Sequence, residues 1–316
     1  MAQRSSPEPV TPTATRLVWH AVGDRLTRRP DQLAVEEPLE IRLGQRGPAD
    51  AMAPDPQHTP RTRGTQVLTV TMRTPGHDFE LATGFLLGEG VISQPKDLRA
   101  VRYCTDLGLN GDQRYNVVTV DLAPDAFRRL MAEGGVTSRL VATSSSCGVC
   151  GSASIEAIAA RFATTVPVDD PGTPAPAFSF RDVVGWPDLL RKVQAGFSAT
   201  GGLHAAGLLT SDNRLLVARE DIGRHNAVDK VIGWGVQQAI AGASAFPFTG
   251  LGLVVSGRTS FEIVQKAIGA GIRLVVSVSA ASSLAARLAD EQGVTLVGFV
   301  RNGAGTVYTR PDRLAP

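Results

Sequence analysis

Two cysteines separated by two residues are the most reactive feature of the sequence. Cys147 and Cys150 lie in the small-residue segment SSSCGVCGSAS, which precedes a predicted helix, IEAIAARF. The dipole of a helix stabilises a thiolate near its N-terminus, so we expect one or both thiols to be more nucleophilic at neutral pH than an ordinary cysteine. Three uses compete: half of a zinc site, a dithiol redox pair, or a sulfur carrier in which a thiolate becomes a persulfide. The pattern permits the sulfur carrier but does not by itself choose it over dithiol exchange.

The zinc interpretation is disfavoured by the other residues of the chain. A structural zinc needs two further ligands, and the sequence offers only Cys104 and five scattered histidines, with no second closely spaced pair. The zinc deaminase signature also fails, because no H-x-E occurs and Ser146, rather than proline, precedes Cys147. A thioredoxin-type pair would directly follow a strand near the start of a βαβ unit, which this segment matches only loosely.

A second candidate site follows the predicted C-terminal strands. The segments SGRTSFE, SAASSL and RNGAG come after these strands and are rich in Gly, Ser or Thr. In the first, a turn leads into a helix N-terminus whose free N–H groups favour an anion, and Arg258 can make a forked contact to phosphate. Helix capping by Thr259 or Ser260 explains the same residues equally well. The segment is not a Walker A loop, because G-x-x-x-x-G-K-[ST] is absent.

Histidines and clustered charges form a third group of candidates. His77, His204 and His225 are either acid–base groups or structural hydrogen-bonding residues. Charged residues concentrate where a predicted strand meets a helix, and a solvated, salt-bridged helix end would account for them. They are Glu220, Asp221, Arg224, His225, Asp229 and Lys230.

The elements that would position these residues follow from the apolar periodicity. Strands are predicted over 34–43, 66–73 and 115–122, with an amphipathic helix that begins near His77 and a second helix after Pro124. Polar, proline-rich runs predict a disordered tail over 1–14 and a surface loop over 44–64. Residues 15–135 are therefore predicted to form a small N-terminal α+β domain.

The rest of the chain, residues 136–316, is predicted to be an α/β domain that carries the cysteine segment and a ligand crevice. A strand over 214–220 precedes a long helix, and apolar strands over 251–255, 272–279 and 294–300 alternate with two helices. This alternation is typical of right-handed βαβ crossovers and of a mixed, largely parallel sheet with helices on both faces. Ligands of such sheets bind beyond the carboxyl ends of the strands.

Composition limits the class of protein. The chain has 316 residues, 43% of them hydrophobic and 20% charged, which fits a globular protein of about two domains. A formal charge of +2 is too small for a general nucleic-acid binder. Three cysteines cannot form a disulfide framework, and we find neither an N-terminal signal sequence nor about 18 consecutive apolar residues, so a cytoplasmic protein without a membrane segment is expected.

Seven segments in one order resemble the formate dehydrogenase accessory sulfurtransferase family, FdhD, over residues 34–303. They are EEPLEIRL, TPGHDFELATGFLLGEGVI, SSSCGVCG, TGGLHAAGLL, EDIGRHNAVDKVIGW, SGRTSFEIVQKAIGAGI and SAASSLAARLA with the following GVTLVGFVRNG. The N-terminal tail, the 44–64 insert and Cys104 depart from the family pattern.

The resemblance implies a sulfurtransferase that accepts persulfide sulfur from a cysteine desulfurase. It would deliver this sulfur to the molybdenum bis(molybdopterin guanine dinucleotide) cofactor, a bound substrate needed for formate dehydrogenase activity. The family also implies a cytidine-deaminase-like main domain without intrinsic metal, and a homodimer. Cys147 matches the persulfide-bearing cysteine and Cys150 its partner. Arg258, in the turn described above, is a further cofactor-binding candidate, because its cation could contact the pyrophosphates of the cofactor. The family's cofactor-binding stretch matches Phe261, Glu262, Ile263, Val264, Gln265 and Lys266.

Two other functions remain open at this point. A non-catalytic chaperone for the molybdenum cofactor would retain formate dehydrogenase maturation without either cysteine and would depend on Arg258 and Lys266. A dithiol oxidoreductase would instead form a reversible Cys147–Cys150 disulfide coupled to a partner disulfide. Without the resemblance, Lys266 would be interpreted as an ordinary surface lysine of an amphipathic helix. Phe261 would either stack on guanine or pack against the first turn of its own helix as a hydrophobic staple.

Overall fold

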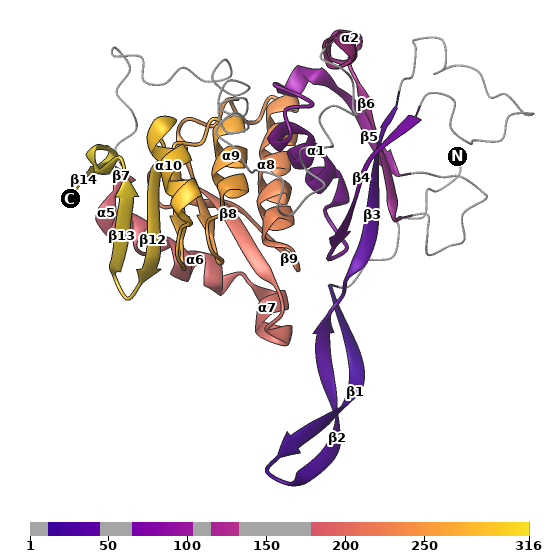
Figure 1. Ribbon diagram of the computed structural model, residues 1–316, viewed down its shortest axis with the longest axis vertical. Coiled ribbons are helices and arrows are strands. Elements are labelled where there is room, and N and C mark those ends of the chain that lie inside the picture. Colours follow the sequence, from indigo (N-terminus) through magenta and orange to yellow (C-terminus); the bar gives the residue numbers. More distant parts are fainter. Residues whose placement is uncertain (1–11, 45–64, 104–114, 133–177, 316) are drawn as a thin grey trace, which may run out of the picture.

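The computed structural model describes residues 12–44, 65–103, 115–132 and 178–315 (Figure 1). The predicted helix IEAIAARF and all but the first residue of the predicted 44–64 loop lie outside these residues, as do Cys104, Cys147 and Cys150. No helix in the described part of the chain is both long and apolar enough to cross a membrane.

A six-stranded sheet forms the larger part of the fold, with the order β13-β12-β11-β10-β8-β9. The strands are β8 (His204–Thr210), β9 (Leu215–Asp221), β10 (Leu251–Val255), β11 (Leu274–Ser277), β12 (Thr295–Arg301) and β13 (Ala304–Thr309). The mixed sheet confirms the predicted α/β architecture, and the predicted strands β9 to β12 are present. The sheet is less parallel than predicted: β10, β11 and β12 pair in parallel, whereas β8, β9 and β13 pair antiparallel. The difference arises because tight turns, which produce antiparallel pairs, join β8 to β9 and β12 to β13.

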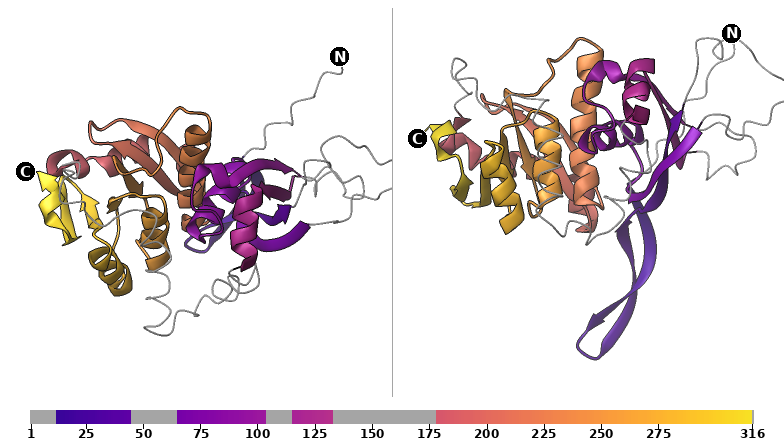
Figure 2. Two further views of the ribbon diagram at one scale, coloured as in Figure 1. Left: turned by 90° about the horizontal axis from the view of Figure 1, so that it is seen from above. Right: turned by 45° about the horizontal axis from the view of Figure 1, so that its top comes forward.

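Helices cover both faces of this sheet, as predicted (Figures 1 and 2). Adjacent strand residues point to opposite faces: Leu253 and Val255 join one buried cluster, and Val254 joins the other. The first face is covered by α8 (Arg224–Ile240), α9 (Phe261–Gly269) and α10 (Ser283–Glu291). The second lies against α5 (Phe180–Val183), α6 (Trp186–Lys192) and the short pair β7 (Phe178–Ser179) and β14 (Leu314–Ala315). Helix α7 (Ala195–Thr200) follows α6, and a 3-10 turn, η4 (Pro311–Arg313), precedes β14.

The N-terminal part contains a second, four-stranded sheet with the order β4-β3-β6-β5. Its elements are β3 (Glu37–Gly44), β4 (Thr65–Arg73), α1 (Asp78–Gly88), η2 (Pro95–Asp97), β5 (Leu98–Tyr103), β6 (Val117–Leu122) and α2 (Pro124–Ala132). This agrees with the predicted α+β content. The predicted boundary at residue 135 lies outside the described residues, so the division into two domains stays a prediction.

Helix α1 joins the two sheets, and its packing differs from the prediction. We expected an amphipathic helix, but nine of its eleven residues are buried, because α1 packs against α8 on one side and the small sheet on the other. A methyl group at Gly84 would lie 1.9 Å from the Asp229 carbonyl oxygen, and one at Gly233 would lie 1.8 Å from the Glu80 carbonyl oxygen. These two glycines therefore let the helix backbones touch, and a single buried cluster extends from Leu39 to Leu296.

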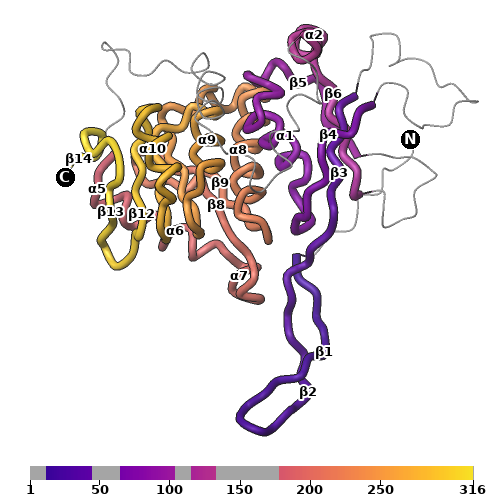
Figure 3. Tube along the Cα trace, viewed as in Figure 1, coloured from indigo at the N-terminus to yellow at the C-terminus, as the bar shows by residue number. Residues whose placement is uncertain are grey.

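A two-stranded hairpin that the periodicity did not predict projects from this body (Figures 1 and 3). It consists of β1 (Thr13–Val22) and β2 (Arg25–Ala34), which pair antiparallel over their whole length. Gly23 supplies the left-handed conformation at the turn, with φ 55°. The predicted tail over 1–14 overlaps this strand, because β1 already begins at Thr13.

Candidate functional site

The carboxyl ends of β10, β11 and β12 meet at one edge of the large sheet, where ligand binding was predicted. Three turns follow these ends, and the antiparallel strand β8 begins beside β10 with His204. The backbone of the first turn is fixed: Ser256 Oγ accepts a hydrogen bond from the Ala205 N–H at 2.9 Å, and the Thr259 N–H donates to the Ala280 carbonyl at 3.1 Å. The turn therefore presents the N-terminus of α9 in a fixed position.

Side-chain capping does not account for the polar residues at this N-terminus. Ser260 is the N-cap residue, but its hydroxyl makes no capping hydrogen bond and instead lies 3.0 Å from His225 Nε2. Thr259 is fully buried, and its Oγ1 has no hydrogen-bond partner among the described residues. The Nε atom of Arg224, at the start of α8, is likewise buried without a partner in the described part of the chain. The free N–H groups at the N-terminus of α9 thus lie near Arg224, whose Cδ would be 3.8 Å from a methyl group at Gly257, and near His225, an arrangement that suits an anion.

The electrostatics of this point are positive even though both histidines are neutral. Burial lowers the pKa of His204, and the nearby guanidinium groups of Arg224 and Arg258 lower it further. Burial, reinforced by Arg224, lowers the pKa of His225 to about 4, against an opposing effect of Glu262. Two arginines therefore carry the positive charge at neutral pH. We call this cluster of His204, Arg224, His225, Arg258 and Ser260 the anion site.

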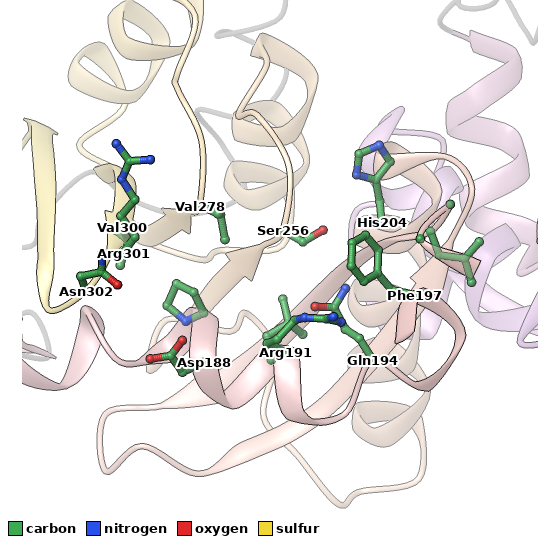
Figure 4. A pocket seen from close by; sticks show the side chains of 15 residues that line it. Asp188, Arg191, Gln194, Phe197, His204, Ser256, Val278, Val300, Arg301 and Asn302 are labelled. Carbon is green, nitrogen blue, oxygen red and sulfur yellow. The ribbon is translucent and has the colours of Figure 1, made fainter. Parts of the chain in front are cut away.

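A cavity of about 410 Å³ lies beside the anion site, with His204 shared between the two (Figure 4). Helices α6 and α7 form its outer wall, and the ends of β10 to β12 form its inner wall. The guanidinium carbon of Arg191 lies 4.4 Å from the centre of the Phe197 ring. Arg301 and Asn302 lie on the opposite side of the cavity. The cavity thus combines an apolar floor, amide groups, two cations and the single carboxylate of Asp188, a net positive lining that suits a ring-containing anion.

Glu220 fixes the wall that carries Phe197. Its two carboxylate oxygens accept hydrogen bonds from the Gly196 and Phe197 N–H groups at 2.8 and 2.7 Å, at the N-terminus of α7. Sequence reasoning placed Glu220 in a charge cluster and missed Arg191, Gln194 and Phe197 altogether. No motif or periodicity marks these three residues, since they reach the cavity only through the packing of α6 and α7.

The predicted cofactor-binding stretch of α9 separates into two parts. Glu262 is exposed near the anion site, 3.7 Å from His225 Nε2, and Phe261 is buried at the helix start. The side chains of the remaining residues, Ile263, Val264, Gln265 and Lys266, are buried and face away from solvent. Gln265 Nε2 donates to the Gly88 carbonyl of α1 at 3.0 Å. Most of this stretch therefore holds α9 against α1 and α8.

Lys266 is neither a surface lysine nor a member of the anion site. Its Nζ lies 2.8 Å from Asp229 Oδ1 and 3.8 Å from Glu89 Oε1. Burial opposes its charge, but these two carboxylates outweigh that effect and raise the pKa of Lys266. The Asp229–Lys266 pair thus joins α8 to α9 inside the protein.

Other clustered charges are also buried, which corrects the expectation of a solvated helix end. Lys230 Nζ lies 2.7 Å from Asp221 Oδ2, and both side chains are almost fully buried. His77 stays at the surface beside Glu80 and lies outside the anion site. Among the described residues, no three His, Cys, Asp or Glu side chains gather as a metal site.

The chain is similar to one family of known proteins over most of its length. Residues 62–315 match the model of the FdhD/NarQ family. A protein of Mycolicibacterium paratuberculosis named sulfur carrier protein FdhD is 47% identical over 304 residues, covering 96% of this chain and 98% of its own. The protein of the same name from Streptomyces coelicolor is 43% identical over 303 residues and 96% of each chain.

A solved structure supports the fold. The crystal structure assigned to a formate dehydrogenase accessory protein of Desulfotalea psychrophila has a TM-score of 0.66 and covers 96% of this chain and 100% of its own, at 21% identity. The length of the family match and the identity to full-length relatives place the chain in one family. This protein is a member of the FdhD/NarQ family.

Proposed function

We propose that this protein is a sulfur carrier that serves formate dehydrogenase. In the first step, the Cys147 thiolate attacks the terminal sulfur of a persulfide held by a cysteine desulfurase. One S–S bond breaks as another forms, and the donor cysteine leaves as a thiolate, so no external oxidant or reductant is needed. The names of the full-length relatives support the carrier role, and the Cys147–Cys150 segment supplies thiols of the kind that this step requires.

In the second step, we propose that the terminal sulfur passes to the molybdenum bis(molybdopterin guanine dinucleotide) cofactor as acceptor substrate. Attack of the Cys150 thiolate on Cys147 Sγ would form a disulfide and release the terminal sulfur as hydrosulfide. The two thiols are then oxidised and the sulfur is reduced by the same two electrons, which balances the step. Thiol–disulfide exchange with an external dithiol reductant, which is itself oxidised to a disulfide, would return both cysteines to the thiol state.

The observation that supports the acceptor most strongly is the anion site. The pyrophosphates of the cofactor carry the charge that Arg224, Arg258 and the α9 N-terminus favour, and their oxygens can accept hydrogen bonds from guanidinium and backbone N–H groups. The adjacent cavity has room for a nucleoside portion. We propose that the N–H groups of Phe261 and Glu262 contact the cofactor, whereas the residues from Ile263 to Lys266 hold the helix in place.

The mass of the intact protein tests the carrier step. Reduced protein is incubated with a cysteine desulfurase and cysteine, with and without a thiol-alkylating reagent. We expect a gain of sulfur that reductant removes and that Cys147→Ala abolishes, while Cys150→Ala reports whether the second thiol holds sulfur. A variant lacking both cysteines that still supports formate dehydrogenase maturation would refute the carrier and favour the cofactor chaperone.

Binding of GDP, a guanine nucleotide with a pyrophosphate, tests the acceptor site. We expect Arg224→Gln and Arg258→Ala each to weaken binding by about tenfold to a hundredfold, because a hydrogen bond to a charged group contributes about 1.5–3 kcal/mol. Arg128→Ala provides the matched control, because that arginine lies exposed on α2 in a surface pair with Asp125. Equal affinity in all three variants would exclude the anion site as the nucleotide site.

A further inference from the structure

The β1–β2 hairpin, which we call the arm, is the largest exposed apolar feature of the described residues. Fourteen large hydrophobic side chains in the described part of the chain are exposed, and the four with the highest exposure all lie on the arm. They are Leu17 at 64%, Trp19 at 65%, Val22 at 65% and Leu26 at 64%. Isolated two-stranded hairpins are marginally stable in water, so such an arm gains most when another surface covers it.

The arm has one apolar face. Strand pairing places Leu17 opposite Pro30, Trp19 opposite Arg28, and Ala21 opposite Leu26, and the alternation of a strand puts these six residues on the same side. The Arg28 guanidinium lies 5.5 Å from the centre of the Trp19 ring. An aromatic ring with a stacked arginine at the centre of an apolar face is the composition that characterises the energetic centre of protein interfaces.

The charge of the arm indicates the chemistry of the partner. The arm carries four arginines and two aspartates, an excess of two positive charges that equals the formal net charge of +2 of the whole chain. The remainder of the chain is therefore balanced overall and offers no net negative charge to the arm of a second copy, and two arms would repel each other. Charge complementarity favours a different protein, with an apolar surface bordered by acidic residues.

The position of the arm indicates which partner this is. Its base contacts α7, and a methyl group at Gly202, just after α7, would lie 3.5 Å from Ala34 Cβ at the end of β2. Phe197 of α7 and Gly202 both line the cavity. Figure 1 shows the base of the arm beside α7, so a protein held by the arm lies near the wall that α7 gives to the cavity. The protein that must approach this cavity is the one that receives its ligand.

We propose that the arm is the docking element for the acceptor apoenzyme, which covers the apolar face with an acid-bordered apolar surface. This inference rests on the proposed function, because that function assigns the cofactor to the cavity and formate dehydrogenase as its recipient.

The test is the affinity of the full chain for apo-formate dehydrogenase purified from cells that cannot make the cofactor. We expect Trp19→Ser to weaken binding by about thirtyfold and Leu17→Ser by about tenfold, because truncation of a side chain at the centre of an interface has effects of this size. The controls are Val70→Ser and Met72→Ser on β4, which remove similarly exposed apolar groups outside the arm, at 57% and 48% exposure. We expect less than a twofold change for them.

Charge reversal covers the case in which the serine variants disorder the arm. Arg25→Glu and Arg29→Glu leave the apolar face intact, and we expect each to weaken binding by about threefold to tenfold at low salt and less at 0.5 M salt, because exposed charges are screened. Wild-type affinity in every arm variant would overturn the proposal, and so would undetectable binding by the wild type.

Two further measurements separate the alternatives. If light scattering showed a wild-type dimer that Trp19→Ser converts to a monomer with unchanged acceptor affinity, the occupant would be a second copy and the proposal would be wrong. Persulfide loading and GDP binding in the same variants report the proposed function independently. We expect both to be unchanged, so a failure of docking is distinguished from a failure of sulfur transfer.

Discussion

Replacement of Lys266 by methionine separates a structural role from a cofactor-binding role. The side chains of Lys266 and Asp229 are only 5% and 3% exposed, and their charged atoms lie 2.8 Å apart. Removal of one partner leaves the other charge buried and unpaired, which costs about 3–5 kcal/mol of unfolding free energy. For a protein of this size, about 2 °C of melting temperature per kcal/mol is expected, so Lys266→Met should melt about 6–10 °C lower.

The double variant Lys266→Met with Asp229→Leu is the matched control. It removes both charges and fills the space with apolar groups, so we expect most of the lost stability to return. Thermal and urea unfolding at pH 7 measure both effects. Those Lys266→Met molecules that are folded at 20 °C should bind GDP within about twofold of wild type. A stable Lys266→Met protein with lost GDP affinity would refute the reasoning, because the ammonium would then contact the ligand rather than Asp229.

The pH dependence of the same variant has a definite sign. Burial raises the pKa of Asp229 to about 6, although Lys266 opposes the shift. The folded state therefore binds more protons than the unfolded state, whose aspartate pKa is about 3.9, and this group's contribution to stability falls as the pH rises from about 4 to 6. Without Lys266, the pKa rises further and the fall continues above pH 6. The stability difference between variant and wild type should then shrink towards pH 4, where the carboxyl is protonated in both.

Three further predictions concern the helix contact, the anion site and the cavity wall. Gly233→Ala should lose at least about 3 kcal/mol in urea unfolding, because its methyl group would lie 1.8 Å from the Glu80 carbonyl oxygen, whereas Gly250→Ala, with no atom within 4 Å, should change little. Sulfate should bind several-fold more tightly at pH 5 than at pH 7 in calorimetry, and its own charge is constant between these two values. The reason is that a bound anion raises the lowered pKa values of His204 and His225, so their protonation is coupled to binding. An affinity that does not change with pH would contradict the assignment of these histidines to the anion site. Glu220→Gln should weaken GDP binding by about tenfold and lower stability by about 1–2 kcal/mol, since its carboxylate holds the α7 N-terminus, and Glu291→Gln on α10 is the control.

Periodicity predicted the strands and helices that surround the anion site and did not predict the arm. The segments after β10, β11 and β12 were identified because parallel strands bring their carboxyl ends to one edge, a rule that needs no knowledge of side-chain packing. The arm was missed because its apolar residues are separated by arginines and its apolar face is not buried in the chain itself. Hydrophobic patterns identify strands that contribute to a core, and the arm contributes to none.

The charged residues show where sequence reasoning stops. Asp221, Asp229, Lys230 and Lys266 have the composition of a solvated helix surface, yet they are buried in pairs. Their burial depends on the contact of α1 with α8, which in turn depends on Gly84 and Gly233. A local pattern cannot contain this information, because α1 and α8 come from distant segments: Glu80 of α1 pairs with Arg219, which lies 139 residues further along the chain.

Buried polar groups play two roles in this molecule. In the core between α1, α8 and α9, the buried pair of Asp229 with Lys266 holds two helices together, and removal of either partner would leave a charge buried and unpaired. Beside the α9 N-terminus, Arg224 Nε is buried without a hydrogen-bond partner among the described residues, and an unsatisfied donor costs about 1–3 kcal/mol. Thr83 Oγ1 and Thr259 Oγ1 are also buried without a partner in the described part of the chain, so such an atom alone does not mark a ligand site. Arg224 differs from them because His204, His225 and the turn at Gly257 lie beside it, and a bound anion would offset its positive charge.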